Sequence, residues 1–131
     1  WSQDGRSIAF VRWTDADLGR VMVVPARGGS ARAVTTEPGH YAHPRFSPDG
    51  RTIAFEAGSG GNLTSDQWGR DAGIYMVPVT GGAPKLVERG GSNPQFGASG
   101  DRLFMTMPGE DKLQLVSTDL NGEVRRVHAS G

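Results

Sequence analysis

Two histidines in one short segment are the residues most able to do chemistry. His40 and His43 stand three positions apart, with Glu37 nearby, and such groups can bind zinc or donate a proton. The sequence assures no third ligand, and the segment reads as a loop rather than the helix of a familiar zinc motif. We therefore predict no metal and no cofactor. Hydrogen-bonded structural histidines are the simpler interpretation, and His40, Tyr41 and His43 remain candidate binding residues on a loop face.

A second candidate lies in residues 58–71, a glycine-rich stretch longer than ordinary hairpin loops. Tryptophan offers a large contact area with a polar handle, so charged residues around it suggest a small recognition patch. The alternative is a flexible insertion whose tryptophan packs against a neighbouring sheet. The candidate contacts for a partner or substrate are Asp66, Trp68, Arg70 and Asp71.

The sequence lacks the other catalytic patterns that we considered for it. There is no Gly-x-Ser-x-Gly nucleophile elbow, and no glycine-rich loop followed by Lys and Ser or Thr for phosphate. Asp4, Asp49 and Asp101 recur in or beside turns, which favours turn capping over acid–base work. We assign no catalytic residue.

A ten-residue sequence pattern, called here the repeated phrase, recurs along the chain and must form the scaffold that positions these residues. It runs through residues 1–10, 46–55 and 96–105, so that its copies begin 45 and 50 residues apart. Such a period is typical of stacked all-β units. Each copy reads as a strand end, a tight turn and a second strand, because proline presets φ and glycine accepts a positive φ. The predicted structural turn residues are Asp4, Gly5, Pro48, Asp49, Gly50 and Gly100.

Each repeat divides into four short strands. In the second repeat we expect them near 43–47, 52–57, 73–79 and 84–88, separated by the repeated turn, the long loop and a Gly-Gly hairpin. Nearly continuous apolar runs suit strands covered on both faces. The chain is therefore one unit, residues 1–131, with blades at about 1–35, 43–88 and 94–128, the first lacking most of its inner strand.

The repeated phrase is similar to the repeat of a known protein family. The aromatic-Ser-Pro-Asp-Gly-Arg-x-Ile-Ala-Phe pattern, followed by Ile-Tyr-x-Val-Pro-x-x-Gly-Gly, resembles the TolB-type β-propeller repeat, a relative of WD repeats. The resemblance implies an all-β fold, a partial β-propeller of about three four-stranded antiparallel blades around a channel. Such propellers occur in periplasmic TolB, in prolyl-oligopeptidase-type peptidases and with amidohydrolases. We therefore expect a bacterial periplasmic or secreted protein.

The composition of the chain argues against some classes of partner and of chemistry. The chain has 131 residues, no cysteine and a formal net charge of zero, which argues against nucleic-acid binding and against thiolate or disulfide chemistry. No apolar stretch is long enough to span a bilayer as a helix.

Topology predicts where binding occurs. In an antiparallel blade the repeated turns share one face, and the irregular loops share the other, where binding is usually placed. We expect a non-catalytic module that binds a protein or peptide. The alternative is a gating or substrate-orienting propeller of a hydrolase whose active site lies outside these residues. About three blades leave two faces uncovered, so we also expect self-association or poor solubility.

Overall fold

The protein is a row of three antiparallel sheets. The computed structural model describes residues 1–15, 18–35, 39–58, 72–110 and 112–130. The first sheet has the order β1 (Ser7–Thr14), β2 (Leu18–Pro25), β3 (Arg32–Ala33). The second has the order β4 (Tyr41–Phe46), β5 (Thr52–Ala57), β6 (Gly73–Pro78), β7 (Lys85–Arg89). The third has the order β8 (Ser92–Phe96), β9 (Arg102–Pro108), β10 (Leu113–Asp119), β11 (Arg126–Ser130).

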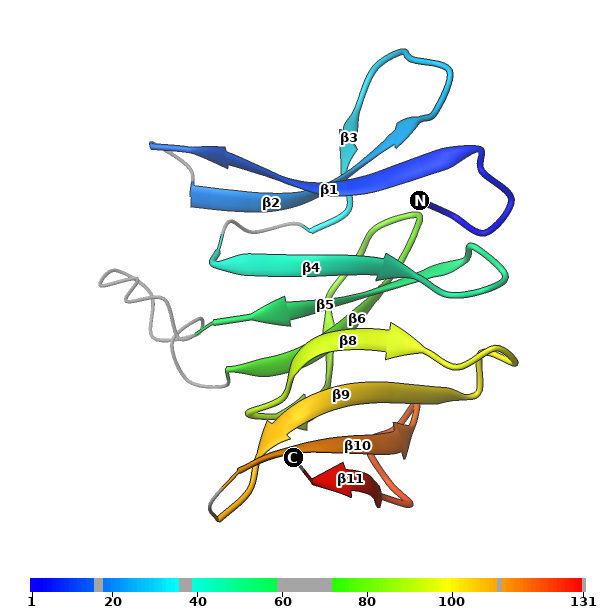
Figure 1. Ribbon diagram of the computed structural model, residues 1–131. Helices are drawn as coiled ribbons and strands as arrows, with labels where there is room; N and C mark the ends of the chain where they lie inside the picture. The colour runs from blue at the N-terminus through cyan, green and yellow to red at the C-terminus, as the bar shows by residue number, and fades with distance from the viewer. Residues whose placement is uncertain (16–17, 36–38, 59–71, 111, 131) are drawn as a thin grey trace.

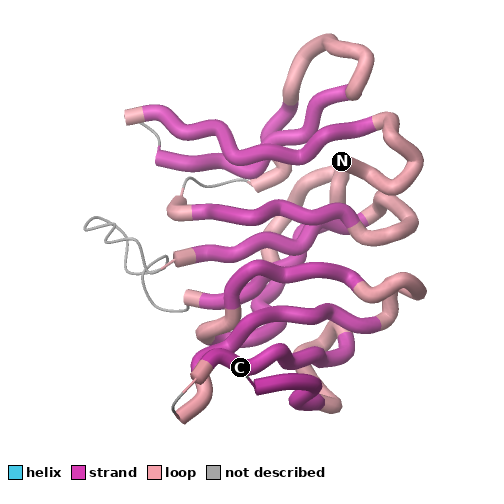
Figure 2. Tube along the Cα trace, in the orientation of Figure 1, coloured by secondary structure: helices cyan, strands magenta, loops and turns pink. Residues whose placement is uncertain are grey.

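We call these sheets blades 1, 2 and 3. They are stacked one after another (Figures 1 and 2). None of the described residues forms a helix, so none of them provides a helix able to cross a membrane. The predicted fold, a partial β-propeller of antiparallel blades, is confirmed. The expected strand at 52–57 coincides with β5, whereas β4 starts at Tyr41, two residues earlier than expected.

Alternation along β5 in blade 2 sends its side chains into two different seams between blades. Ile53 and Phe55 of β5 face blade 1, while Ala54 lies in the cluster with blade 3. The seam between blades 1 and 2 contains the buried residues Val21, Val23, Val34, Tyr41, Ile53, Phe55 and Val77. The seam between blades 2 and 3 contains Ala54, Ile74, Val87, Leu103, Met105, Met107 and Val116. Blade 2 is thus covered on both faces, which explains its nearly continuous apolar strands.

The repeated turns share one backbone geometry. The amide N–H of each turn glycine, Gly5, Gly50 and Gly100, donates to the carbonyl three residues earlier, at 3.0, 2.9 and 3.0 Å. Their φ angles are 74°, 74° and 78°, in the region that L side chains avoid. The sequence prediction of positive φ at these glycines therefore agrees with the backbone.

Outer strands also join neighbouring blades. Arg32 Nη1 of β3 donates to the carbonyl of Val79 in the β6–β7 turn at 2.6 Å. One blade later, Lys85 Nζ of β7 donates to Asn121 Oδ1 in the β10–β11 turn at 2.7 Å. The outer strands of blades 1 and 2 thus each contact the hairpin turn of the following blade.

The connections separate into two faces, as antiparallel topology requires. Turns of the repeated phrase, within 2–7, 47–51 and 97–101, lie at one end of the strands, on the right in Figure 1. The first residues of β4, β8 and β10 lie at the other end. We call these the turn face and the loop face.

Candidate binding surface on the inner strands

The innermost strands of blades 2 and 3 have the same irregularity. His43 in β4 has φ 54° and Asn93 in β8 has φ 53°, and each precedes a proline, Pro44 or Pro94. Pairing shifts at both places, between Ala42 and Arg45 in one strand and between Ser92 and Gln95 in the other. Left-handed backbone is costly for residues other than glycine and tends to occur where function requires it.

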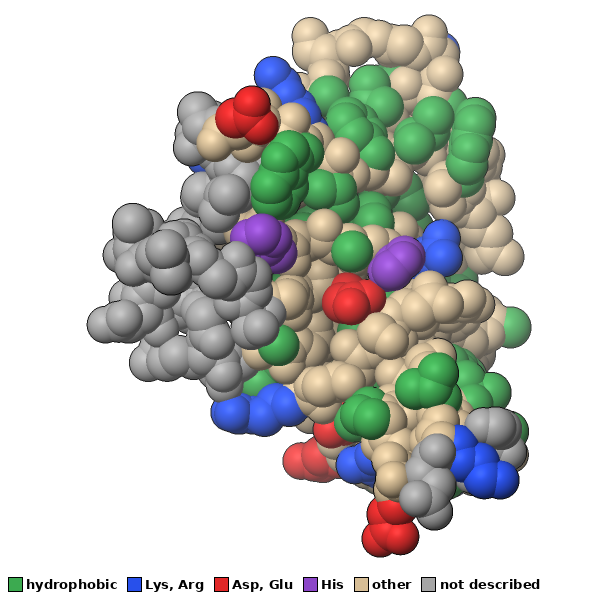
Figure 3. Space-filling view, turned by 60° about the vertical axis from the view of Figure 1, so that its left-hand side comes forward, with side chains coloured by type: hydrophobic (Ala, Val, Ile, Leu, Met, Phe, Trp, Pro, Cys, Tyr) green, Lys and Arg blue, Asp and Glu red, His purple; other side chains and the backbone are tan. Residues whose placement is uncertain are grey.

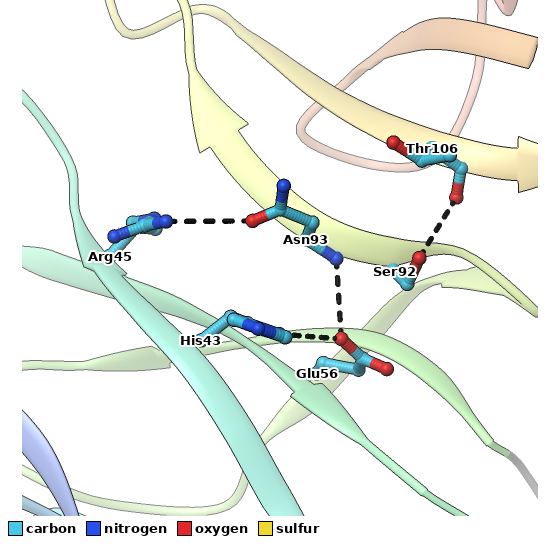
Figure 4. A network of polar contacts seen from close by, with 6 residues as sticks. All are labelled: His43, Arg45, Glu56, Ser92, Asn93 and Thr106. Carbon is cyan, nitrogen blue, oxygen red and sulfur yellow. Dashed lines mark hydrogen bonds and ion pairs between the residues drawn. The ribbon is translucent and has the colours of Figure 1, made fainter.

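A carboxylate joins the two strained positions. Glu56 of β5 accepts a hydrogen bond from Nδ1 of His43 at 2.9 Å and another from the backbone N–H of Asn93 at 3.2 Å, both through Oε2 (Figure 4). Because a carboxylate oxygen only accepts, Nδ1 of His43 holds the proton in this contact. Glu56 therefore ties the inner strand of blade 2 to that of blade 3.

Two further contacts extend this network. Nη2 of Arg45 lies 3.5 Å from Oδ1 of Asn93, and the hydroxyl of Ser92 lies at the same distance from the carbonyl of Thr106. The imidazole of His43 remains 52% exposed and Glu56 26%. Figure 3, turned toward the loop face, shows histidine, acidic and basic side chains together on this surface. The inner strands thus present donors and acceptors to solvent on a rigid support.

The other predicted residues of this segment lie apart from the network. The ring of His40 is 5.2 Å from that of Trp13, centroid to centroid, and Trp13 is 51% exposed. Tyr41 is instead buried, at 7% exposure, and its ring meets Phe55 edge-on at 5.1 Å. Tyr41 therefore packs in the seam between blades 1 and 2 instead of lying on the loop face, because β4 already begins there.

The remaining candidates are not placed by the structure. Asp66, Trp68, Arg70 and Asp71 lie outside the described residues, as does Glu37. Among the residues that are described, no three of His, Cys, Asp and Glu gather in a way that could hold a metal ion.

The turn aspartates act within their own turns. Oδ1 of Asp49 accepts from the hydroxyl of Ser47 at 2.6 Å and from the backbone N–H of Arg51 at 3.0 Å. These bonds, the serine bond first, hold the pKa of Asp49 below its ordinary value. Asp4 makes the matching bonds to Ser2 and Arg6, with the same lowering of its pKa. Both aspartates are fixed as turn caps.

One pair in blade 3 has the spacing of a nucleophile and its base. The hydroxyl of Ser117 lies 2.7 Å from Nε2 of His128, and Arg102 donates to the same hydroxyl at 2.8 and 3.1 Å. Ser117, however, is fully buried, and no carboxylate contacts His128 among the described residues. The cluster satisfies polar groups within the blade and provides no substrate access.

Sequence reasoning missed Arg45, Glu56 and Asn93. A signal was available, because both residues precede a proline at the same place of the repeat. His43 lies three residues before Phe46, and Asn93 lies three residues before Phe96. Glu56 gave no signal, because a single acid in a strand is common.

The chain resembles known proteins in one segment of its sequence and in its fold. No family model matches the chain. A segment of 53 residues, 40% of the chain, is 38% identical to the uncharacterized peptidase YuxL of Bacillus subtilis, of which it covers 8%. Among solved structures, a protein of Agrobacterium tumefaciens assigned as TolB superposes with a TM-score of 0.78 at 21% identity, over 97% of this chain and 46% of that one.

The fold is that of TolB-type β-propeller repeats. A puromycin-hydrolyzing peptidase of Mycobacterium tuberculosis also superposes, with a TM-score of 0.66 at 17% identity, over the whole of this chain and 23% of that protein. The chain therefore spans less than half the length of each of these proteins. TolB proteins and peptidases both contain this arrangement of blades, so the fold alone does not separate binding from hydrolysis.

Proposed function

We propose that this chain is a non-catalytic propeller module that binds a protein or peptide at its loop face. The observation that carries the proposal is the network of His43, Glu56 and Asn93. Two exposed polar residues are held in left-handed backbone at equivalent places of adjacent blades, and one carboxylate fixes both. Strain maintained at exposed, preorganised polar groups is typical of recognition sites.

The proposed ligand is an extended peptide segment of a partner protein. The inner strands offer a line of polar groups, and the aromatic pair of Trp13 and His40 lies on the same face. An aromatic contact beside fixed hydrogen-bonding groups is the usual composition of a binding surface. The sequence prediction that Asp66, Trp68, Arg70 and Asp71 contact the partner is part of the proposal.

A peptide library selected against the protein tests this assignment. Replacing His43 or Asn93 with glycine removes the side chain and keeps a residue that tolerates the same φ. We expect selected peptides to bind either variant at least about tenfold more weakly, a loss of about 1.4 kcal/mol. Val124→Gly is the matched control, because Val124 also has positive φ, at 48°, but lies in the β10–β11 turn. Peptides that bind all variants equally would refute the proposal.

The loop patch has its own test. Replacing residues 58–72 with Asn-Gly should leave circular dichroism and melting nearly unchanged while weakening the same peptides. Loss of folding would instead identify Trp68 as a packing residue.

A second candidate is a propeller that orients substrates for a hydrolase domain of a longer protein. The 38% identity to a peptidase segment favours it. If the longer protein contains an α/β-hydrolase or amidohydrolase domain and cleaves peptide p-nitroanilides, this candidate replaces the first.

We further propose a periplasmic or secreted location in a bacterium, supported by the likeness to TolB. Fractionation of cells producing the tagged protein tests it, and recovery in the cytoplasmic fraction alone would contradict it.

A further inference from the structure

The turn ends of the inner strands enclose a hollow that shares Arg45 with the network of His43, Glu56 and Asn93. It has a volume of about 520 Å³ and lies between the turn ends of the inner strands. Its lining comes from all three blades. The residues used below are Phe46, Phe96, Pro48, Arg45, Gln95 and Gln3.

The apolar walls of the hollow are rigid. Phe46 packs on the cluster between blades 1 and 2, and Phe96 on the cluster between blades 2 and 3. Both rings remain partly exposed, so each keeps one side for a ligand. Pro48 belongs to a turn that is fixed by hydrogen bonds. Ser47 is bonded to Thr52 of the following strand, and the N–H of Gly50 donates to the carbonyl of Ser47. A ligand entering between these groups would cause little loss of conformational freedom.

The charge on the side chains that line the hollow is positive. Arg45 is its one charged side chain; the other long polar side chains are the neutral Gln3 and Gln95, and the lining includes no carboxylate. Within the described part of the chain, the guanidinium of Arg45 has a single polar neighbour, Oδ1 of Asn93 at 3.5 Å. Arg45 is exposed and makes no ion pair there. Most of its five N–H donors are therefore free, in the fork that matches a carboxylate.

We propose that this hollow is a second binding site, which takes a peptide carrying a carboxylate next to an aromatic or large aliphatic side chain. Arg45 binds the carboxylate, Gln3 and Gln95 donate to peptide carbonyls, and the apolar side chain lies against Phe46, Phe96 and Pro48. The volume suits one or two residues of a peptide. The carboxylate can belong to a chain terminus or to an acidic side chain, because the guanidinium offers the same bonds to both.

Three labelled peptides separate these sources: acetyl-Ala-Ala-Phe with a free terminus, its amide, and acetyl-Ala-Asp-Phe-amide. Fluorescence polarisation measures their binding to the protein. We expect the amide without acid to bind at least about tenfold more weakly than one of the two acidic peptides. Equal binding of all three, or no binding of any at millimolar peptide, would overturn the proposal.

Charge substitutions locate the site. Arg45→Gln should reduce binding of the preferred acidic peptide to that of the neutral amide, whereas Arg27→Gln, on the β2–β3 turn, should leave it unchanged. Gln95 is exposed, so its variants should fold whether or not those of Arg45 do. Gln95→Glu should weaken and Gln95→Lys should strengthen binding of the acidic peptide, with the amide unaffected. Insensitivity to both Gln95 variants would refute the assignment.

The hollow and the loop-face network share Arg45, but the two proposals can be tested separately. His43→Gly removes the bond to Glu56, keeps the contact between Arg45 and Asn93, and should leave the acidic peptides bound. Loss of one site with retention of the other identifies which proposal has failed.

Discussion

Phe10 and Phe55 occupy the same place in two copies of the repeat, and their surroundings differ. Phe55 is fully buried, because β5 faces blade 1 across the first seam. Phe10 points to the side of β1 that faces away from blade 2 and is only partly buried. By contrast, the turns before them are alike: Gly5 and Gly50 both have φ 74° and the same hydrogen bond. Local geometry thus follows the repeated phrase, whereas burial follows the neighbouring blade.

The largest difference is expected when the two rings are truncated. Phe55→Ala should destabilise the protein by about 3–5 kcal/mol, because it leaves a cavity in a closed seam. Phe10→Ala should cost about 1 kcal/mol, since less apolar area is buried there. Urea denaturation followed by circular dichroism measures both. Equal losses would mean that the outer side of blade 1 is covered in solution.

Valine at the two turn glycines should have equal effects. No atom lies within 4 Å of a Cβ placed at Gly5 or Gly50, so only backbone strain contributes. Each substitution should cost at least about 1 kcal/mol, because a β-branched residue avoids positive φ. The same denaturation experiment applies. A clear difference between the two variants would show that the neighbouring blade also acts on the turn.

The uncovered sides of blades 1 and 3 should make the protein self-associate. On blade 3, Leu113 and Leu115 are 61% and 42% exposed. Light scattering at tens of micromolar should detect assemblies, and Leu115→Glu should reduce them by placing a charge on that side. Val124→Glu, at another exposed apolar residue, is the control and should change nothing. A wild-type protein that stays monomeric would contradict the expectation.

The smallest expected effect is the pH dependence of the two capped turns. The folded pKa of Asp4 and of Asp49 lies below the unfolded value of about 3.9, so the unfolded chain binds more protons. Their contribution to stability is therefore present above about pH 4 and is lost as pH falls through the folded pKa. Asp49→Asn and Asp4→Asn should each flatten the fall in melting temperature between about pH 5 and pH 2 to a similar degree. Variants that melt with the pH profile of the wild type would rule out this linkage.

Much of the fold could be predicted because its signals are local. Gly50 and its equivalents require positive φ, and the alternation in β5 separates Ile53 and Phe55 from Ala54. The site was less accessible, because its strain opposes local preference: a residue before proline, such as His43 or Asn93, normally adopts extended backbone. Tyr41 was assigned to a loop because the start of β4 has no marker in the sequence. Contacts such as that of Glu56 with Asn93 join residues from different blades and cannot be read from spacing.

The length of the turn between β4 and β5 has a consequence beyond the turn itself. Successive side chains of β5 enter opposite seams, so this turn decides which residue volumes fill which side of blade 2. Inserting a single residue would send Phe55 toward blade 3 and Ala54 toward blade 1, crowding one seam and emptying the other. Inserting two would restore the parity. The residue count of this hairpin is therefore constrained by the packing on both sides of blade 2, in addition to the positive φ that Gly50 requires.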